Sequence, residues 1–196
     1  ASDVYKRQVS NGATHLLTGE NQTALTQGYY SDYTKFSDSE AEAIRRYYDY
    51  MIRYENLFFD PELQDVTMTH TGWDNYEYQC TSHKVSSYGE AGKIWMILRE
   101  KDYRKCIYLL NLCGQSEDYW NEGKEEPNIQ KDIKFTVQVD TPVEKICFST
   151  PDGENMDAIE LSFTERATKT GKFIDFTVPS LNYWTTIWID TRKETI

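Results

Sequence analysis

The clearest periodic pattern in the chain predicts a helix that begins near Ser37 and ends at Asp60. Ser37 is followed three residues later by Glu40, which is the spacing of a capping box at a helix start. Pro61 ends the helix, because the residue before a proline is pushed out of the helical region. Between these limits apolar residues recur at helical spacing, at Ala41, Ile44, Tyr48, Met51, Ile52, Leu57 and Phe58.

A short apolar segment precedes this helix. Residues 13–17 are mostly apolar and run into the polar residues 18–21, which predicts a buried strand that ends in a turn. A loop rich in Gln, Thr, Ser and Tyr separates this predicted strand from the helix.

Beyond Pro61 the pattern changes to short strands separated by turns. Residues 99–103 are highly charged and predict a hairpin turn, while residues 115–127 are too polar for a core and predict an exposed loop. The predicted strands are 66–69, 92–98, 106–112, 133–139, 143–148, 159–163, 173–178 and 183–189. Such a series is typical of an antiparallel sandwich or barrel. The sequence therefore predicts a mainly β fold, with an antiparallel β-sandwich over residues 61–196 and a domain boundary at Asp60/Pro61.

The first eight residues stand apart from this pattern. Residues 2–8 resemble a peptide that recurs at the ends of metagenomic open reading frames, where sequencing-adapter DNA has been translated. We therefore expect residues 1–8 to be an adapter-derived leader, which is left out of fold reasoning as a tag would be. On this interpretation any targeting signal would lie upstream of the chain.

Composition and charge narrow the classes of partner. The chain has 196 residues, enough for one or two domains, and 14% of them are aromatic, whereas disordered chains are poor in aromatic residues. The net charge of -11 has no local cluster of Lys and Arg to offset it, so neither nucleic acid nor an anionic membrane surface is an expected partner. No apolar run approaches the roughly 20 residues that a membrane-spanning helix needs, so membrane insertion is not expected. A neutral glycan is compatible with this net charge, because it is not repelled by it.

The residue patterns of a metal site or a cofactor site are absent from the sequence. The three histidines form no HExxH or similar ligand pattern, and the four cysteines have no metal-ligand spacing, so we expect no metal and no cofactor. There is also no nucleophile elbow and no phosphate loop. Cys106 and Cys113 lie seven residues apart on one predicted strand, which places them on opposite faces of it. The sequence leaves the pairing of the cysteines open.

Paired carboxyl groups, which polysaccharide hydrolysis normally needs, are not evident either. The acidic residues of the predicted helix and of the 115–127 loop have the pattern of solvated faces. His15 and Glu20 are the exception, because they flank the end of the first predicted strand, where a (β/α) barrel would place substrate-facing residues. The other interpretation, a core histidine and a turn residue, stays open on these residues alone.

Several strings in the chain resemble glycoside hydrolase family sixty-six, the family of dextranases and cycloisomaltooligosaccharide glucanotransferases. Residues 14–20 resemble the closing strand of its barrel, and residues 46–57 resemble its Tyr-rich helix, which is the most specific match. Further similar strings are Lys93-Ile94-Trp95, residues 107–112, Tyr119-Trp120 and residues 178–184. The resemblance covers nearly everything after Gln8.

This resemblance implies an endo-acting enzyme that cleaves an α-1,6-glucan such as dextran with retention. Retention uses a carboxylate nucleophile and an acid/base roughly 5 Å apart. The resemblance places both groups upstream of this chain, so we expect no catalytic residue here and treat residues 9–60 as the last strand, loop and helix of a truncated (β/α)8 barrel. His15 and Glu20 would support the rim of the cleft, and Tyr29 and Tyr30 would stack on sugar rings. The expected partners are the glucan and the upstream barrel, at an extracellular, cell-surface or periplasmic location.

A second hypothesis is a non-catalytic sandwich that binds carbohydrate or braces a neighbouring domain. A sugar platform needs an exposed ring, and Trp73 and Trp120 lie in polar loops where they could supply one. Trp95 and Trp184 lie inside apolar strands and are predicted to be in the core. For residues 61–196 taken alone we rank bracing ahead of sugar binding.

Overall fold

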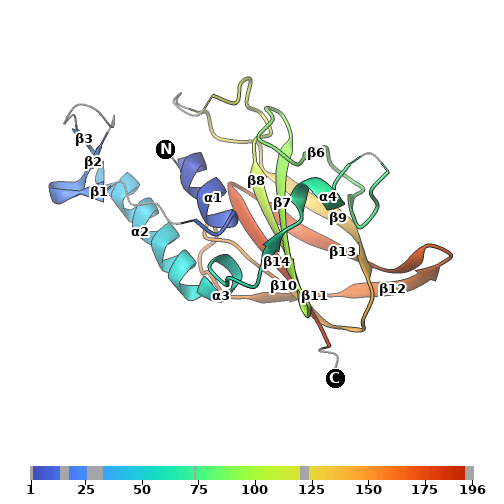
Figure 1. The fold of residues 1–196 in the computed structure, drawn as a ribbon. Coiled ribbons are helices and arrows are strands. Elements are labelled where there is room, and N and C mark those ends of the chain that lie inside the picture. Colours follow the sequence, from blue (N-terminus) through green and yellow to red (C-terminus); the bar gives the residue numbers. More distant parts are fainter. Residues whose placement is uncertain (1, 14–17, 26–32, 73, 120–123, 193–196) are drawn as a thin grey trace.

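The computed structural model describes residues 2–13, 18–25, 33–72, 74–119 and 124–192. Two β-sheets form a sandwich, and helices lie on one side of it (Figure 1). The large sheet has the strand order β11-β10-β14-β8-β7-β4, with β6 paired in parallel to β7, and the small sheet has the order β12-β13-β9-β5. The other described pairs in the sandwich are antiparallel. The predicted mainly β, antiparallel fold is therefore confirmed.

The strands follow the alternation of apolar and polar residues where one face meets the core. The large sheet consists of β4 (Gln64–Asp65), β6 (Val85–Ser86), β7 (Ile94–Lys101), β8 (Arg104–Asn111), β10 (Val143–Ser149), β11 (Ile159–Leu161) and β14 (Trp184–Thr191). The small sheet consists of β5 (Tyr78–Cys80), β9 (Gln130–Val139), β12 (Phe163–Thr168) and β13 (Gly171–Leu181). Side chains at alternate positions of β9, such as Ile133, Phe135 and Val137, are buried against inward residues of the large sheet.

The central strands of the large sheet, β7, β8 and β14, are buried on both faces. Residues 94–98 of β7 are buried without alternation, which is typical of a strand covered on two sides. One face belongs to the core between the sheets, and the other packs against α2 (Asp38–Arg53) and α3 (Glu55–Phe58). Trp95 and Trp184 lie in this second cluster at 6% and 1% exposure, which confirms that they are core residues.

The predicted start of the helix is confirmed. The Oγ atom of Ser37 accepts a hydrogen bond from the backbone N–H of Glu40 at 3.3 Å, and Glu40 Oε2 accepts one from the backbone N–H of Ser37 at 2.8 Å. This reciprocal pair is the capping box that the sequence predicts.

The predicted apolar positions of the helix are buried or half-buried, with the exception of Ile52. Tyr50, Met51 and Tyr54 are buried against the sheet, whereas Ile52 is 68% exposed. The prediction for Ile52 is therefore wrong. The helix is turned so that its tyrosines face the sandwich, because their hydroxyl groups find partners there.

One local prediction on the sandwich is wrong, and another is right only in part. Residues 66–69 were expected as a strand, but Thr67–His70 form the helix α4, whose first turn is closed by a hydrogen bond of 2.8 Å from the Thr67 N–H to Asp65 Oδ1. The hairpin turn expected at residues 99–103 is present but shorter, because β7 continues to Lys101 and β8 begins at Arg104, which leaves residues 102–103 as the turn. The charged residues extend the ladder because they pair across it, as Glu100 does with Lys105 at 2.7 Å.

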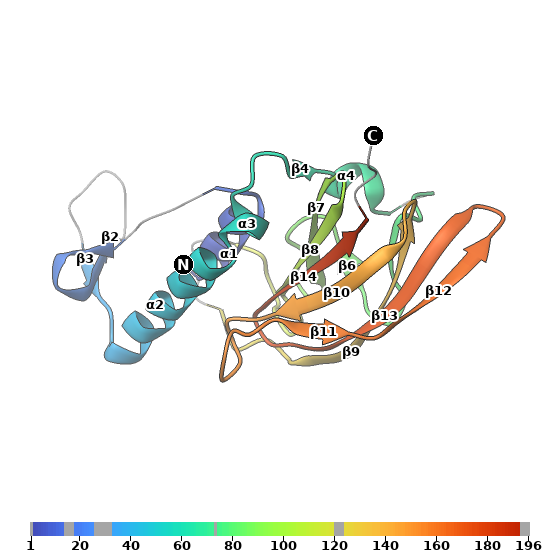
Figure 2. The same cartoon turned by 90° about the horizontal axis from the view of Figure 1, so that it is seen from below.

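The N-terminal elements lie outside the sandwich. Ser2–Ser10 form helix α1, in which Lys6 and Val9 are buried at 2% and 1% exposure. The helices α1, α2 and α3 lie on the same side of the sandwich in both views (Figure 1 and Figure 2). The three-stranded sheet β1 (Thr18–Gly19), β2 (Thr23–Leu25) and β3 (Tyr33–Lys35) lies at the far end of α2.

The domain limits inferred from the sequence are not decided by this arrangement. The boundary at Asp60/Pro61, the assignment of residues 9–60 to a barrel, and the adapter origin of residues 1–8 all stay predictions. Of the predicted strand at 13–17, residues 14–17 lie outside the described residues.

The cysteines divide between the two clusters. Cys106 is buried on the face of β8 toward the helices, and Cys113 packs against the core between the sheets. Cys113 lies in a turn beyond the end of β8, so the prediction that both residues belong to one strand is wrong. All four cysteines are unpaired. Within the described residues, no helix combines the length and the apolar character needed to cross a bilayer.

Candidate functional site

Most of the residues singled out from the sequence lie outside the described residues. This holds for His15, Tyr29, Tyr30, Trp73 and Trp120. The backbone of Glu20 is described and begins the short 3-10 helix η1 (Glu20–Gln22). The roles predicted for these residues therefore stay predictions.

Several of the described acidic residues are engaged in capping or ion pairs. Every described carboxyl group whose pKa departs clearly from its usual value has that pKa lowered, mainly by a side-chain hydrogen bond. The pairs are Glu40 with Ser37, Glu42 with Arg45, Asp60 with Lys101, Glu90 with Lys93, and Glu117 with Lys124. A glycosidase acid needs a raised pKa. These carboxyl groups therefore lack the electrostatic signature of a general acid.

The described histidines and cysteines form no reactive group. His70 Nδ1 lies 2.8 Å from the Thr69 hydroxyl, and His83 Nδ1 lies 2.7 Å from the Ser82 hydroxyl, so each ring is tied to its neighbour. Burial raises the pKa of the Cys106 thiol to about 12, which keeps it protonated. Among the described residues, His, Cys, Asp and Glu side chains nowhere gather in a set of three that could hold a metal ion.

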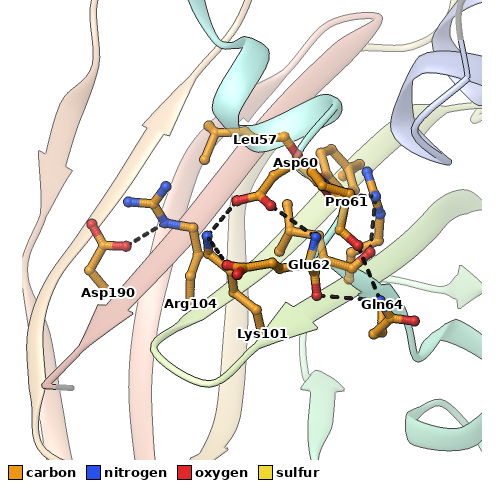
Figure 3. Close-up of polar contacts among 11 residues, drawn as sticks. Leu57, Asp60, Pro61, Glu62, Gln64, Lys101, Arg104 and Asp190 are labelled. Carbon is orange, nitrogen blue, oxygen red and sulfur yellow. Dashed lines mark hydrogen bonds and ion pairs between the residues drawn. The ribbon is translucent and has the colours of Figure 1, made fainter. Parts of the chain in front are cut away.

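The most organised polar arrangement joins the end of α3 to the large sheet, as Figure 3 shows. The Arg99 guanidinium, 7% exposed, donates a hydrogen bond of 2.6 Å to the carbonyl oxygen of Phe58. It donates further bonds to the carbonyl oxygens of Leu63, at 3.0 Å, and of Asp60, at 3.5 Å. A carbonyl oxygen at a helix end has no partner within the helix, so Arg99 supplies the partner that the Phe58 carbonyl lacks.

An ion pair also connects the end of α3 to the large sheet. Lys101 forms an ion pair with Asp60, and their side chains are 8% and 17% exposed. The hydrogen bond from Lys101 is the main cause of the lowered pKa of Asp60. Tyr108 donates its hydroxyl proton to the carbonyl oxygen of Leu57. We call the residues Leu57, Phe58, Asp60, Leu63, Arg99, Lys101 and Tyr108 the helix–sheet joint.

Tyrosines in α2 and at its C-terminal end form a second set of hydrogen bonds to the sandwich. Tyr50 donates to the carbonyl oxygen of Ser149 at 3.0 Å, and Tyr54 donates to that of Met156 at 2.6 Å. Tyr47 donates at 3.0 Å to Asp152 Oδ1. The second oxygen of Asp152 accepts hydrogen bonds from the backbone N–H groups of Tyr183, at 2.9 Å, and Trp184, at 2.7 Å.

These tyrosines explain why the helix is Tyr-rich, and sequence reasoning missed them. Their spacing of three and four residues places Tyr47, Tyr50 and Tyr54 on one face of a helix, a signal that the printed sequence contains. The Tyr47 and Tyr50 rings pack against Trp184, with centroids 6.3 Å and 5.3 Å away, and the Tyr54 ring lies 5.5 Å from that of Trp188. The arrangement can fix the helix rigidly on the sandwich, and it offers no group for bond cleavage.

Comparison with known proteins gives a family. The profile described as Glycosyl hydrolase family 66 matches residues 7–188. Two cycloisomaltooligosaccharide glucanotransferases of Niallia circulans are 29% and 26% identical over 183 residues, which are 92% of this chain. The chain spans 18% of the length of these curated relatives.

A solved structure has the same fold. The crystal structure of a Paenibacillus sp. cycloisomaltooligosaccharide glucanotransferase complexed with cycloisomaltoheptaose matches 94% of this chain with a TM-score of 0.78. The sequence identity is 24%, and the match covers 27% of that chain. The likeness extends over the helices and the sandwich together.

Proposed function

The chain belongs to glycosyl hydrolase family 66, and on that premise we propose that it is the C-terminal part of an endo-acting, retaining enzyme for α-1,6-glucan. The enzyme is a hydrolase of dextran or a glucanotransferase, and this part of it lacks the catalytic carboxylates. The observation that carries the proposal is the family match, which is continuous from residue 7 to residue 188 and so crosses the helix–sheet joint.

The role of this part is to brace the catalytic part of the enzyme. Retaining cleavage requires a carboxylate nucleophile and a carboxylic acid roughly 5 Å apart. Every described carboxyl group whose pKa clearly departs from its usual value has a lowered pKa. A lowered pKa is typical of a carboxylate in an ion pair and not of a group that donates a proton. The helix–sheet joint supports bracing, because it couples α2 and α3 to the sandwich through buried hydrogen bonds.

His15, Glu20, Tyr29 and Tyr30 belong to this proposal as contacts at the rim of the substrate cleft. They precede α2 in the chain, so a rigid joint between α2 and the sandwich would also restrain the segment that carries them. The proposed location is outside the cytoplasm, since a polymer such as dextran does not cross membranes unaided.

The proposal is tested with the chain itself and with an extended protein. The purified chain, incubated with dextran, should release no new reducing ends. The protein extended upstream should cleave dextran internally, and proton NMR should show the α-anomer as the first product, as retention requires. Cleavage by the chain alone would contradict the absence of catalytic carboxylates, and a β-anomeric first product would contradict retention.

The alternative is a non-catalytic module that binds carbohydrate or serves only as a structural element. The exposed tyrosines of the sandwich favour it, since Tyr88 and Tyr119 are 60% and 65% exposed. Under this alternative Trp73 and Trp120 are the sugar platforms, and alanine at both positions should abolish retention on a dextran matrix. Unchanged retention would remove these two residues from the site.

A further inference from the structure

A surface hollow on the sandwich has the composition of a sugar-binding site. Its volume is about 590 Å³, within the usual range for ligand pockets of roughly 300–1,000 Å³. It is bordered by α4, β5, β6 and the segment that leads into β7. We call it the Tyr88 groove and define it by Met68, Asn75, Gln79, Ser87, Tyr88 and Glu90.

Tyr88 offers an exposed ring on an anchored loop. Its side chain is 60% exposed, although its neighbours in the chain are tied to the protein. Ser86 is 7% exposed, and its Oγ atom accepts a hydrogen bond of 3.4 Å from the backbone N–H of Tyr88. Gly89 lies so close to the Trp95 ring that a Cβ atom there would be 3.0 Å from it. The backbone that carries Tyr88 is therefore anchored before any ligand binds, which lowers the entropy cost of ordering the loop on binding.

The rest of the groove combines an apolar surface with neutral hydrogen-bonding groups. Met68, 72% exposed, adds a second apolar surface. The side-chain amides of Asn75 and Gln79 each donate and accept hydrogen bonds, as sugar hydroxyl groups do. Glu90 forms an ion pair with Lys93, so its charge is balanced within the groove.

A larger hollow of about 710 Å³ on the small sheet is less suited to a sugar. It is lined by two carboxylates, Glu160 and Asp175, and Asp175 already accepts hydrogen bonds from Thr136 on one oxygen and from Arg166 on the other. Two of its aromatic residues, Phe135 and Phe176, are buried at 1% and 5% exposure. They cannot present a ring face to a ligand, whereas Tyr88 can.

We propose that the Tyr88 groove is an accessory binding site for an α-1,6-linked glucan chain. Tyr88 stacks on a glucose ring, and Asn75, Gln79 and Ser87 bind hydroxyl groups of the chain. The net charge of -11 disfavours polyanionic glycans and leaves a neutral one as the occupant. The α-1,6 linkage rests on the proposed function, whereas the position of the site rests on the groove.

The experiment is a titration of the ¹⁵N-labelled chain with isomaltoheptaose, followed by backbone amide chemical shifts. We expect saturable shifts that are concentrated at residues 68–93. Tyr88→Ala should weaken binding about tenfold or more, because a stacked aromatic anchor dominates such a site. Tyr88→Phe should keep most of the affinity, since the ring is retained. Tyr119→Ala is the matched control, because Tyr119 is 65% exposed and lies outside the groove.

The outcomes separate this inference from the proposed function. Shifts at residues 68–93 that Tyr88→Ala abolishes would support the site, provided that the variant unfolds at the wild-type temperature. No saturable shift with isomaltoheptaose, or a loss of binding with Tyr119→Ala in place of Tyr88→Ala, would overturn it. An equal response to maltoheptaose would overturn the α-1,6 assignment. Dextran cleavage by the upstream-extended protein is a separate measurement, so the proposed function can stand when this inference fails.

Discussion

Arg99 on the large sheet donates a hydrogen bond of 2.6 Å to the carbonyl oxygen of Phe58, the last residue of α3. The two residues lie 41 positions apart in the chain, and the bond is buried. One guanidinium thus connects the end of the helical layer to the sheet. The ion pair of Lys101 with Asp60 links the same two elements (Figure 3).

Replacing Arg99 should therefore destabilise the whole chain. Arg99→Leu leaves the carbonyl oxygens of Phe58 and Leu63 buried without their donor, and we expect it to lower the free energy of unfolding by about 2–4 kcal/mol. Arg99→Lys should recover only part of this loss, because an ammonium group cannot reach carbonyls in different directions as a guanidinium fork does. Urea denaturation monitored by circular dichroism measures both values.

The control for Arg99 is an exposed ion pair on α2. Arg45 pairs with Glu42, and their side chains are 67% and 63% exposed. Arg45→Ala should change the free energy of unfolding by no more than about 0.5 kcal/mol. Equal effects of Arg99→Leu and Arg45→Ala would contradict a special role for the joint.

Asp60 makes the free energy of unfolding depend on pH in the acidic range. Its pKa is lowered in the folded state, mainly by the hydrogen bond from Lys101, so folding favours the carboxylate. The stability that this group contributes is present above its unfolded pKa of about 3.9 and is lost as the pH falls below that value. Asp60→Asn should lower the free energy of unfolding at pH 7 by about 1 kcal/mol and flatten its acid dependence. Glu42→Gln, in the exposed pair, should leave the neutral-pH stability nearly unchanged.

Trp184 is the centre of the aromatic contact between helix and sheet. It is 1% exposed, and the Tyr50 and Phe58 rings lie 5.3 Å and 5.2 Å from it, centroid to centroid. Trp184→Ala should lower the free energy of unfolding by about 3–5 kcal/mol because it opens a large cavity. Tyr119→Ala, at an exposed position, should stay within about 0.5 kcal/mol of wild type. Thermal melts of both variants make the comparison, and similar melting temperatures would contradict the predicted packing.

Removing residues 1–60 tests whether the sandwich folds stably on its own. The fragment 61–196 loses the residues of α2 and α3 that cover Trp95, Tyr108 and Trp184. We expect it to bind the dye ANS and to be digested by trypsin faster than the same residues in the whole chain. A fragment as resistant as the whole chain would favour the boundary at Asp60/Pro61 as the limit of an independent domain.

Alkaline pH should weaken the fold through Cys106. Burial raises the pKa of this thiol to about 12, whereas an unfolded thiol titrates near about 8.5. Between these values the unfolded chain has released the proton and the folded chain has kept it, so stability falls as the pH rises through this window. Urea denaturation of the wild type and of Cys106→Ala at pH 8 and pH 10 should show a smaller loss in the variant. Identical losses would contradict the prediction.

The long strands and the helix start could be predicted from the sequence because their signals are local, whereas the short strands β5 and β6 were not predicted. Alternation in β9 and the Ser37–Glu40 capping box involve residues close together in the chain. The helix–sheet joint could not be predicted in this way. Residues 99–103 have the composition of a charged turn, and only the tertiary structure buries Arg99 against the carbonyl oxygens of Phe58 and Leu63.

The burial of Tyr50 and Tyr54 could not be predicted from local sequence either. Tyr50 and Tyr54 are buried because the carbonyl oxygens of Ser149 and Met156, about a hundred residues away, accept their hydroxyl protons. Apolar spacing alone favoured Ile52, which is exposed. The Tyr88 groove could not be predicted from the sequence either. It is assembled from α4, β5 and β6, and α4 was expected to be a strand.

The central claim is that this chain is part of a larger α-1,6-glucan-cleaving enzyme, and the most direct test is to sequence the original DNA upstream of Val9. We predict an in-frame stretch of several hundred residues with alternating strand and helix periodicity and with paired Asp and Glu at strand ends. A start codon and signal peptide immediately upstream of Val9 would contradict the claim, because no barrel would then exist for this chain to brace.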